Sequence, residues 1–225
     1  DNADKTNPLK SVAHEVFEAL FSSVARPGFT RGPGLSSKSN LFGQQIVLMD
    51  NRSFRDPVNA PNANLQWGTT QEDWLMNSIG NQANPAFVIN GGQFFGAYLE
   101  KDSMEYETPN RLKQMIARLR DIQAPVMFGS GDVHFSELMR LERELLGYES
   151  YELTSSSIHS TNYKFANMRT NNSRRLASAW QHNFMMIETD ASRASLGEID
   201  MKVGCIGNGL LGVEGYFAKK LSIRR

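Results

Sequence analysis

The segment APVMFGSGDVHFSE, residues 124–137, contains the features that decide the fold. Its apolar run, residues 124–128, has the length and composition of a buried β-strand. A Gly-Ser-Gly turn follows, and Asp132 and His134 then stand two residues apart. A carboxylate and an imidazole beside a buried strand suit a metal such as Zn, Fe or Mn. The alternative is structural, with Asp132 capping the next turn and His134 packed on Phe135.

The chain before this segment alternates between strands and helices. Apolar runs predict strands at 44–50, 85–92 and 124–128, and helical spacing predicts helices at 68–81 and 108–122. This alternation predicts an α/β layer with largely parallel strands, whose carboxyl ends meet in one crevice. At the first helix, Thr69 and Glu72 are expected to form a capping box.

The flanking segments have different patterns. Residues 8–24 place apolar side chains at helical spacing and predict an amphipathic helix, whereas glycine, proline and serine in 27–43 predict a loop. Residues 136–147 fit a helix or a strand equally well, and 159–175 are expected to form a polar surface excursion. Four further strands are predicted, at 148–156, 183–190, 197–207 and 214–223, and the last three are expected to form an antiparallel meander. No convincing linker divides the chain, so we expect a single domain over residues 1–225.

Composition excludes several classes of protein. Lysine plus arginine equals aspartate plus glutamate, 24 of each, so the net charge predicts no nucleic-acid-binding patch. Cys205 is the single cysteine, so no disulfide forms within the chain. Apolar runs are too short to predict a transmembrane segment.

Four motifs in a fixed order resemble the alkaline phosphatase D-like branch of the calcineurin-like metallophosphoesterases. They are Asp-x-Arg-x-x-Arg at 50–55, Gly-x-x-Gln-x-x-Trp-Leu at 68–75, Gly-Asp-Val-His at 131–134 and Leu-Thr-Ser-Ser at 153–156. The resemblance implies part of a four-layer α/β/β/α sandwich, with a mixed sheet and the C-terminal meander. It also implies hydrolysis of phosphate mono- or diesters by a water that two metal ions activate. The family is commonly exported, so a periplasmic or extracellular location is expected.

The resemblance also implies roles for individual residues. Asp132 and His134 match the late metal-binding motif, for which Fe, Zn, Mn or Ca are the expected metals. Arg52 is expected to contact phosphate oxygens; the alternative is an ion pair with a neighbouring aspartate. Gln93 stands where relatives often place a metal-binding histidine, so a polar contact with the substrate is expected. His159 is the third candidate for substrate binding, with a solvated loop histidine as the alternative.

The early family motifs, an aspartate pair with a tyrosine and an Asp-Asp-His segment, do not occur. The opening residues DNADKT resemble those that follow the Asp-Asp-His segment. We therefore expect the C-terminal half of a metallophosphatase-like catalytic domain, with the N-terminal half as a partner that completes the site. A non-catalytic module on the same scaffold is the main alternative. A serine hydrolase using Ser155, Ser156 or Ser157 with His159 is a third hypothesis, although no G-x-S-x-G elbow is present.

Overall fold

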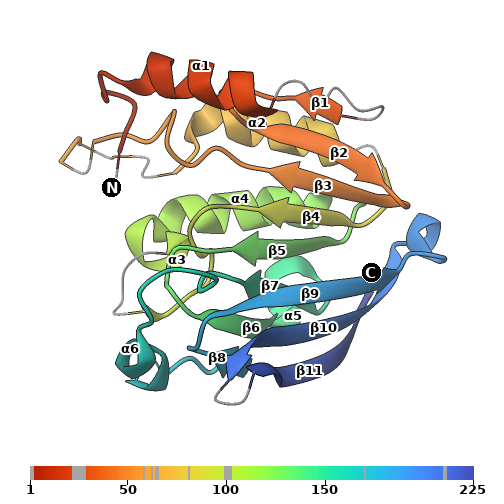
Figure 1. Ribbon diagram of the computed structural model, residues 1–225. Coiled ribbons are helices and arrows are strands. Elements are labelled where there is room, and N and C mark those ends of the chain that lie inside the picture. Colours follow the sequence, from red (N-terminus) through yellow and green to blue (C-terminus); the bar gives the residue numbers. More distant parts are fainter. Residues whose placement is uncertain are drawn as a thin grey trace.

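The computed structural model describes residues 3–21, 29–57, 59–61, 63, 66–80, 82–98, 103–169, 171–209 and 212–225. A large sheet runs through the centre of the molecule (Figure 1), with eight strands in the order β1-β2-β3-β4-β5-β7-β6-β8. Its strands are β1 (Phe29–Arg31), β2 (Ser37–Leu41), β3 (Gln44–Leu48), β4 (Ala86–Ile89), β5 (Val126–Ser130), β6 (Ser136–Leu141), β7 (Ser150–Thr154) and β8 (Arg175–Ala179). The central strands β3, β4, β5 and β7 are parallel, and the outer pairs are antiparallel.

Helices cover one face of the large sheet. The helices of the chain are α1 (Lys10–Phe21), α2 (Gly68–Ile79), α3 (Met104–Glu107), α4 (Pro109–Asp121), α5 (Arg143–Leu146) and α6 (Lys164–Arg169). The helices α2 and α4 are the crossovers between parallel strands, and both lie behind the sheet in Figure 1. Buried side chains such as Leu75 and Ile79 of α2 and Leu119 of α4 pack there with Val47 and Val88 of the sheet. No helix in the described part of the chain is long and apolar enough to cross a membrane.

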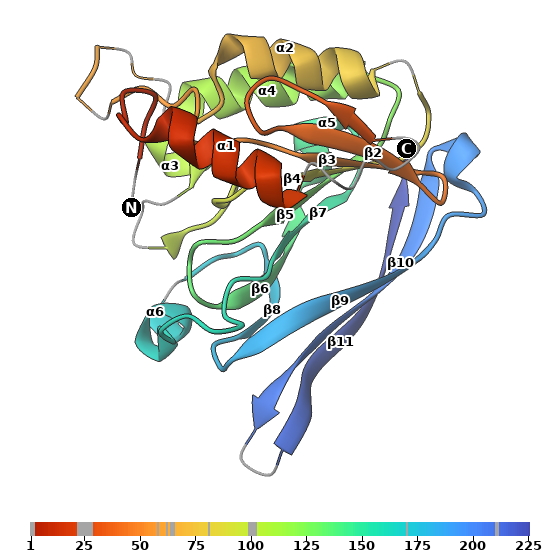
Figure 2. The same ribbon diagram turned by 45° about the horizontal axis from the view of Figure 1, so that its top comes forward.

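A small antiparallel sheet lies on the other face. It contains β9 (Asn183–Asp190), β10 (Glu198–Gly209) and β11 (Gly212–Arg224), in the order β11-β10-β9. Alternate residues of β10, including Met201 and Val203, are buried in the common core. Figure 2 shows this sheet and α1 on the side of the large sheet opposite to α2 and α4. The mixed α/β architecture and the C-terminal meander confirm the predicted fold class.

Several local predictions were wrong. The segment 27–43 is not a simple loop, because it contains β1 and β2, which pair with each other and with β3. The sequences of β1 and β2 are polar and lack an apolar strand pattern, because these strands are held by backbone pairing. The expected capping box is absent, since α2 begins at Gly68 with Trp67 as N-cap and no side-chain cap bond. Thr69 therefore lies inside the first turn, and Glu72 instead accepts a hydrogen bond of 2.8 Å from Arg111.

The segments that the sequence left undecided also have definite structures. Residues 136–147 divide into β6 and the short helix α5, which Gly147 ends in the left-handed region at φ 86°. The predicted surface excursion contains α6 and the start of β8, which pairs with β6 at the edge of the large sheet. The excursion is therefore anchored to the sheet at its C-terminal end.

Candidate functional site

The carboxyl ends of the four parallel strands meet at one edge of the large sheet, as the alternation of strands and helices predicts. Backbone hydrogen bonds of 2.8–3.0 Å join the residues that leave these strands: Met49 to Ile89, Asn90 to Gly129, and Ser155 to Ser130. Asp132 and His134 follow β5 at this edge. Sites in parallel sheets lie in this position, so we take the four strand ends as the candidate site.

Asp132 and His134 both have left-handed backbone conformations, with φ of 76° and 58°. Such φ values are unfavourable for residues with a Cβ and persist only where the surroundings hold them. The intervening Val133 and the following Phe135 are buried, and they hold the loop down. The two candidate side chains consequently point away from the core: Asp132 is exposed and His134 is partly exposed.

The ring of His134 has a fixed orientation. Its Nδ1 lies 3.0 Å from the carbonyl oxygen of Thr161, and the ring stacks on Tyr163 at 4.7 Å between centroids. A carbonyl oxygen only accepts hydrogen bonds, so Nδ1 donates to it, and in the neutral imidazole this tautomer puts the lone pair on Nε2. A backbone carbonyl on Nδ1 is the arrangement typical of metal-binding histidines. In the structural alternative His134 packs on Phe135, whereas the ring that stacks on His134 is that of Tyr163.

The ligand set that the described residues offer is incomplete. Among them, no group of three or more histidine, cysteine, aspartate or glutamate side chains is placed to hold a metal ion. The carboxylate of Asp132 and Nε2 of His134 suit a metal chemically. They are only two ligand side chains, fewer than a binuclear centre requires.

The end of β3 is organised by Asp50. Its buried carboxylate accepts backbone hydrogen bonds from Leu35, Arg52 and Ser53 at 2.9–3.0 Å. Burial works to raise the pKa of Asp50, but the hydrogen bonds from Ser53, Leu35 and Arg52 outweigh it and the pKa is lowered. Asp50 is thus a structural anion, and its bond to the backbone of Arg52 fixes that residue at the strand end.

Asn51 is a residue of this edge to which sequence reasoning gave no role. Its side chain packs so closely on Gly91 that a Cβ at residue 91 would lie 2.8 Å from the amide nitrogen of Asn51. The carbonyl oxygen of Gly91 in turn would lie 3.2 Å from a Cβ at residue 131. The two glycines therefore allow the ends of β3, β4 and β5 to approach closely. The signal in the sequence was a glycine at each of two successive strand ends.

Gln93 lies beneath the strand ends. The residue is only 1% exposed, and its side-chain Nε2 donates hydrogen bonds to Glu137 at 3.1 Å and to Thr154 at 2.9 Å. The structure therefore brings Gln93 into the buried polar network under the site, away from the exposed side chain of Asp132. His159 is exposed on the loop after β7, two residues before the Thr161 carbonyl that orients His134.

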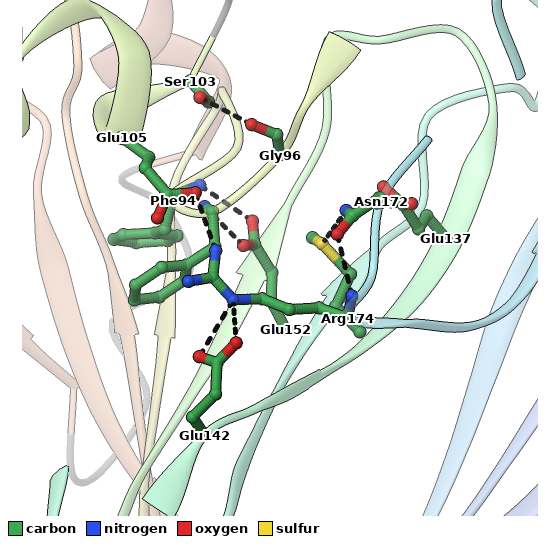
Figure 3. Close-up of polar contacts among 11 residues, drawn as sticks. Phe94, Gly96, Ser103, Glu105, Glu137, Glu142, Glu152, Asn172 and Arg174 are labelled. Carbon is green, nitrogen blue, oxygen red and sulfur yellow. Dashed lines mark hydrogen bonds and ion pairs between the residues drawn. The ribbon is translucent and has the colours of Figure 1, made fainter. Parts of the chain in front are cut away.

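A buried polar network supports the site from below (Figure 3). Glu152 is completely buried on β7 and accepts hydrogen bonds from the backbone of Phe94 and Phe95, both at 2.8 Å, and from Ser130 Oγ at 2.6 Å. Burial raises the pKa of Glu152 to about 7, and the neighbouring charge of Glu137 acts in the same direction. The network ties the loop after β4 to the end of β5, two residues before Asp132.

A second buried carboxylate is neutralised by an arginine. Glu137 on β6 is fully buried, and its carboxylate forms an ion pair with Arg175, whose Nε lies 2.5 Å from Oε1. The guanidinium of Arg175 also lies over the ring of Phe135, 5.7 Å from its centroid. The next residue, Arg174, pairs with Glu105 and Glu142 at 2.7 and 2.8 Å, as Figure 3 shows. These two arginines connect the start of β8 to the rest of the network.

Replacing Arg175 with methionine is expected to lower the free energy of unfolding by about 3–5 kcal/mol, because it leaves the charge of Glu137 buried and unpaired. Urea unfolding at pH 7 measures this loss. Arg140→Met is the matched control, because Arg140 pairs at 3.9 Å with Glu149 on the surface and should cost less than about 1 kcal/mol. Equal losses in the two variants would show that the buried pair has no special weight.

The serines after β7 are engaged in structural hydrogen bonds. The hydroxyl of Ser155 accepts from the backbone of Met185 at 3.1 Å, and that of Ser156 accepts from the backbone of His134 at 3.3 Å. The hydroxyl of Ser157 is buried and donates to the carbonyl of Gln181 at 2.8 Å. These contacts position the loop around His134, and they do not support a nucleophilic serine activated by His159.

Comparison with known proteins supports the fold alone. No protein-family model matches the chain, and no curated protein matches its sequence. Among solved structures the chain is similar to one described as "Structure of PhoD", with a TM-score of 0.66 and 14% sequence identity. The match covers 97% of this chain and 53% of that chain, so this chain spans about half the length of the PhoD structure. The chain therefore has a PhoD-like mixed α/β fold.

Proposed function

We propose that this chain is part of a metal-dependent hydrolase of phosphate mono- or diesters, of the alkaline phosphatase D type. The observation that supports this most is the orientation of His134, two residues after Asp132, whose Nδ1 bonds the Thr161 carbonyl and leaves Nε2 free of that contact. The similarity of the fold to the PhoD structure, with a TM-score of 0.66, also supports the proposal. The chain then corresponds to the C-terminal half of the catalytic domain.

Each candidate site residue has a proposed role. Asp132 and His134 would hold metal ions, two in the complete site, with Fe, Zn, Mn or Ca as candidates. Bound metal would supply a water of lowered pKa and would offset charge on the phosphate. Arg52, whose backbone is held at the end of β3 by Asp50, would contact phosphate oxygens through its forked guanidinium. His159 remains a candidate for substrate contact, and Gln93 would act through the network beneath. By the same resemblance we propose export from the cytoplasm.

The second candidate is a non-catalytic module on the same scaffold. The incomplete ligand set among the described residues favours it. The left-handed conformations of both Asp132 and His134 favour the catalytic proposal, because such strain concentrates at functional sites.

Metal removal tests the proposal in the protein that contains the whole site. We expect dialysis against a chelator to abolish hydrolysis of nitrophenyl phosphate or bis-nitrophenyl phosphate, and Mn²⁺ or Zn²⁺ to restore it. Ser155→Ala should leave the rate unchanged, since that hydroxyl binds the backbone of Met185. Hydrolysis that survives the chelator, or that is lost in Ser155→Ala, would contradict the proposal. No hydrolysis under any condition would favour the non-catalytic module.

A further inference from the structure

The backbone on both sides of Asn51 is held in place just after β3. Gln71 on α2 bonds the main chain of the preceding residue, Asp50, with both ends of its carboxamide. Its Oε1 accepts from the Asp50 amide at 2.7 Å, and its Nε2 donates to the Asp50 carbonyl at 2.8 Å. The following residue, Arg52, donates its backbone amide to the carboxylate of Asp50 at 3.0 Å. Asn51 therefore has a fixed position at the edge of the large sheet.

The side chain of Asn51 reaches from β3 across to the end of the next strand, β4. A Cβ at residue 91 would lie 2.8 Å from Nδ2, 2.9 Å from Oδ1 and 3.1 Å from Cγ of Asn51. These are the three heavy atoms nearest to that position, so the carboxamide occupies the space that a side chain at residue 91 would need. Gly91 has no left-handed φ, and it is therefore the space, not the backbone conformation, that requires a glycine there.

This reach brings the carboxamide of Asn51 close to the metal-binding candidates. The carbonyl oxygen of Gly91 would lie 3.2 Å from a Cβ at residue 131, and residue 131 directly precedes Asp132. Neighbouring strands are about 5 Å apart. A side chain placed over the end of β4 consequently lies about one strand spacing from the end of β5.

The carboxamide of Asn51 has no partner in the protein. No hydrogen bond joins it to another residue in the part of the chain that the structure describes. Two neighbouring carboxamides, by contrast, use both of their polar atoms within the protein. Those of Gln71 hold Asp50, and Asn90 accepts from Trp67 at 2.9 Å and donates to the Gly92 carbonyl at 2.9 Å. Asn51 is thus held in place while its donors and its acceptor stay available to a ligand.

The position between the other candidate residues indicates which ligand this is. Asp132 and His134 would hold metal at the end of β5, and Arg52 would contact phosphate oxygens from the end of β3. A phosphate group that meets both would lie over the end of β4, where the carboxamide of Asn51 is found. An ionised phosphate oxygen accepts hydrogen bonds, and Nδ2 of asparagine carries two donor hydrogens.

We propose that Nδ2 of Asn51 donates a hydrogen bond to a phosphate oxygen in the candidate site, and that Gly91 is a positioning residue which leaves room for this carboxamide. Arg52 would supply positive charge, whereas Asn51 orients the phosphate without adding charge. This inference rests on the proposed function, because it adds a substrate contact to the same site.

Nuclear magnetic resonance of the isotopically labelled 225-residue chain, titrated with inorganic phosphate, tests the contact. The side-chain NH₂ signals of Asn51 are those missing from Asn51→Ala. We expect these signals to shift and to approach saturation at about 10 mM phosphate, as for a Kd near 1 mM. The NH₂ signals of Asn77, which is exposed on α2 behind the sheet, are the internal control and should not move.

Two alanine variants test the role of Gly91 in the same titration. Gly91→Ala should displace the carboxamide and weaken phosphate binding about tenfold, as Asn51→Ala should, because each removes one hydrogen bond to a charged group. The double variant should be no weaker than either single variant, since both act on one contact. Gly215→Ala is the matched control, because a Cβ at that exposed position on β11 meets nothing within 4 Å. It should keep the wild-type affinity.

Three results would overturn the inference. Signals of Asn51 that stay in place up to about 10 mM phosphate would show that no contact forms. Equal shifts of Asn51 and Asn77 would indicate an adventitious ion only. Wild-type affinity in Gly91→Ala would show that Gly91 does not position Asn51. The titration involves no hydrolysis, so these failures are distinguishable from hydrolysis that survives a chelator, which would contradict the proposed function itself.

Discussion

Glu152→Gln is expected to remove most of the loss of stability that the wild-type protein undergoes as the pH rises from about 4.5 to about 7. The pKa of Glu152 rises from 4.5 to about 7 in the folded protein because the carboxyl group is buried. The folded state therefore binds a proton that the unfolded state releases. The stability from this proton is fully present below pH 4.5 and is lost as the pH passes 7. The loss amounts to about 3 kcal/mol.

The slope of unfolding free energy against pH is the quantity to measure, by urea unfolding between pH 4.5 and pH 8. The glutamine variant also loses an acceptor for the backbone of Phe94 or Phe95, so its absolute stability falls at every pH. Glu144→Gln, at an exposed position on α5, is the matched control and should keep the wild-type slope. If Glu152→Gln also keeps that slope, the buried carboxyl does not titrate in this range.

His134→Ala is expected to lower hydrolysis of a nitrophenyl phosphate by more than about 100-fold in the protein that contains the whole site. Loss of groups that only orient a metal ligand typically costs about 10–100-fold, and loss of the ligand itself costs more. Tyr163→Ala, which removes the ring stacked on His134, should fall within the smaller range. Steady-state rates at saturating metal measure both effects.

His182→Ala is the control for that experiment, since His182 is exposed in the turn before β9 and its ring Nδ1 lies 3.3 Å from a backbone carbonyl, that of Ser157. It should retain the wild-type rate. Wild-type activity in His134→Ala, with the fold intact by circular dichroism, would remove His134 from the reaction.

The parallel centre of the sheet was predictable because its strands are continuous apolar runs and its helices have clear periodicity. Strand prediction failed where a strand is held mainly by backbone pairing with its neighbours and has no apolar pattern of its own. The residues Ser37–Leu41 of β2 carry little apolar signal, and β8 is a short strand that begins at the end of a polar stretch. The meander was predictable from its alternation and its turns, which are local properties.

The candidate site was predictable only in part. Asp132 and His134 stand only two residues apart in the sequence, so their proximity needed no knowledge of the fold. The Thr161 carbonyl that orients His134 lies 27 residues away, in a segment whose sequence predicts only a surface excursion. Burial of Glu137 became possible through Arg175, 38 residues further on. Such long-range pairing leaves no signal in a single sequence, which is why the bonds of Gln93 to Glu137 and Thr154 were not predicted.

The most direct test of a metal site at Asp132 and His134 is nuclear magnetic resonance of the isotopically labelled chain during titration with Mn²⁺. A paramagnetic ion broadens the signals of nearby amides even where binding is weak. We expect broadening to begin at the amides of residues 130–136 and 155–161 and to disappear in His134→Ala. Broadening that centres elsewhere, or that is unchanged in His134→Ala, would contradict the proposed metal site.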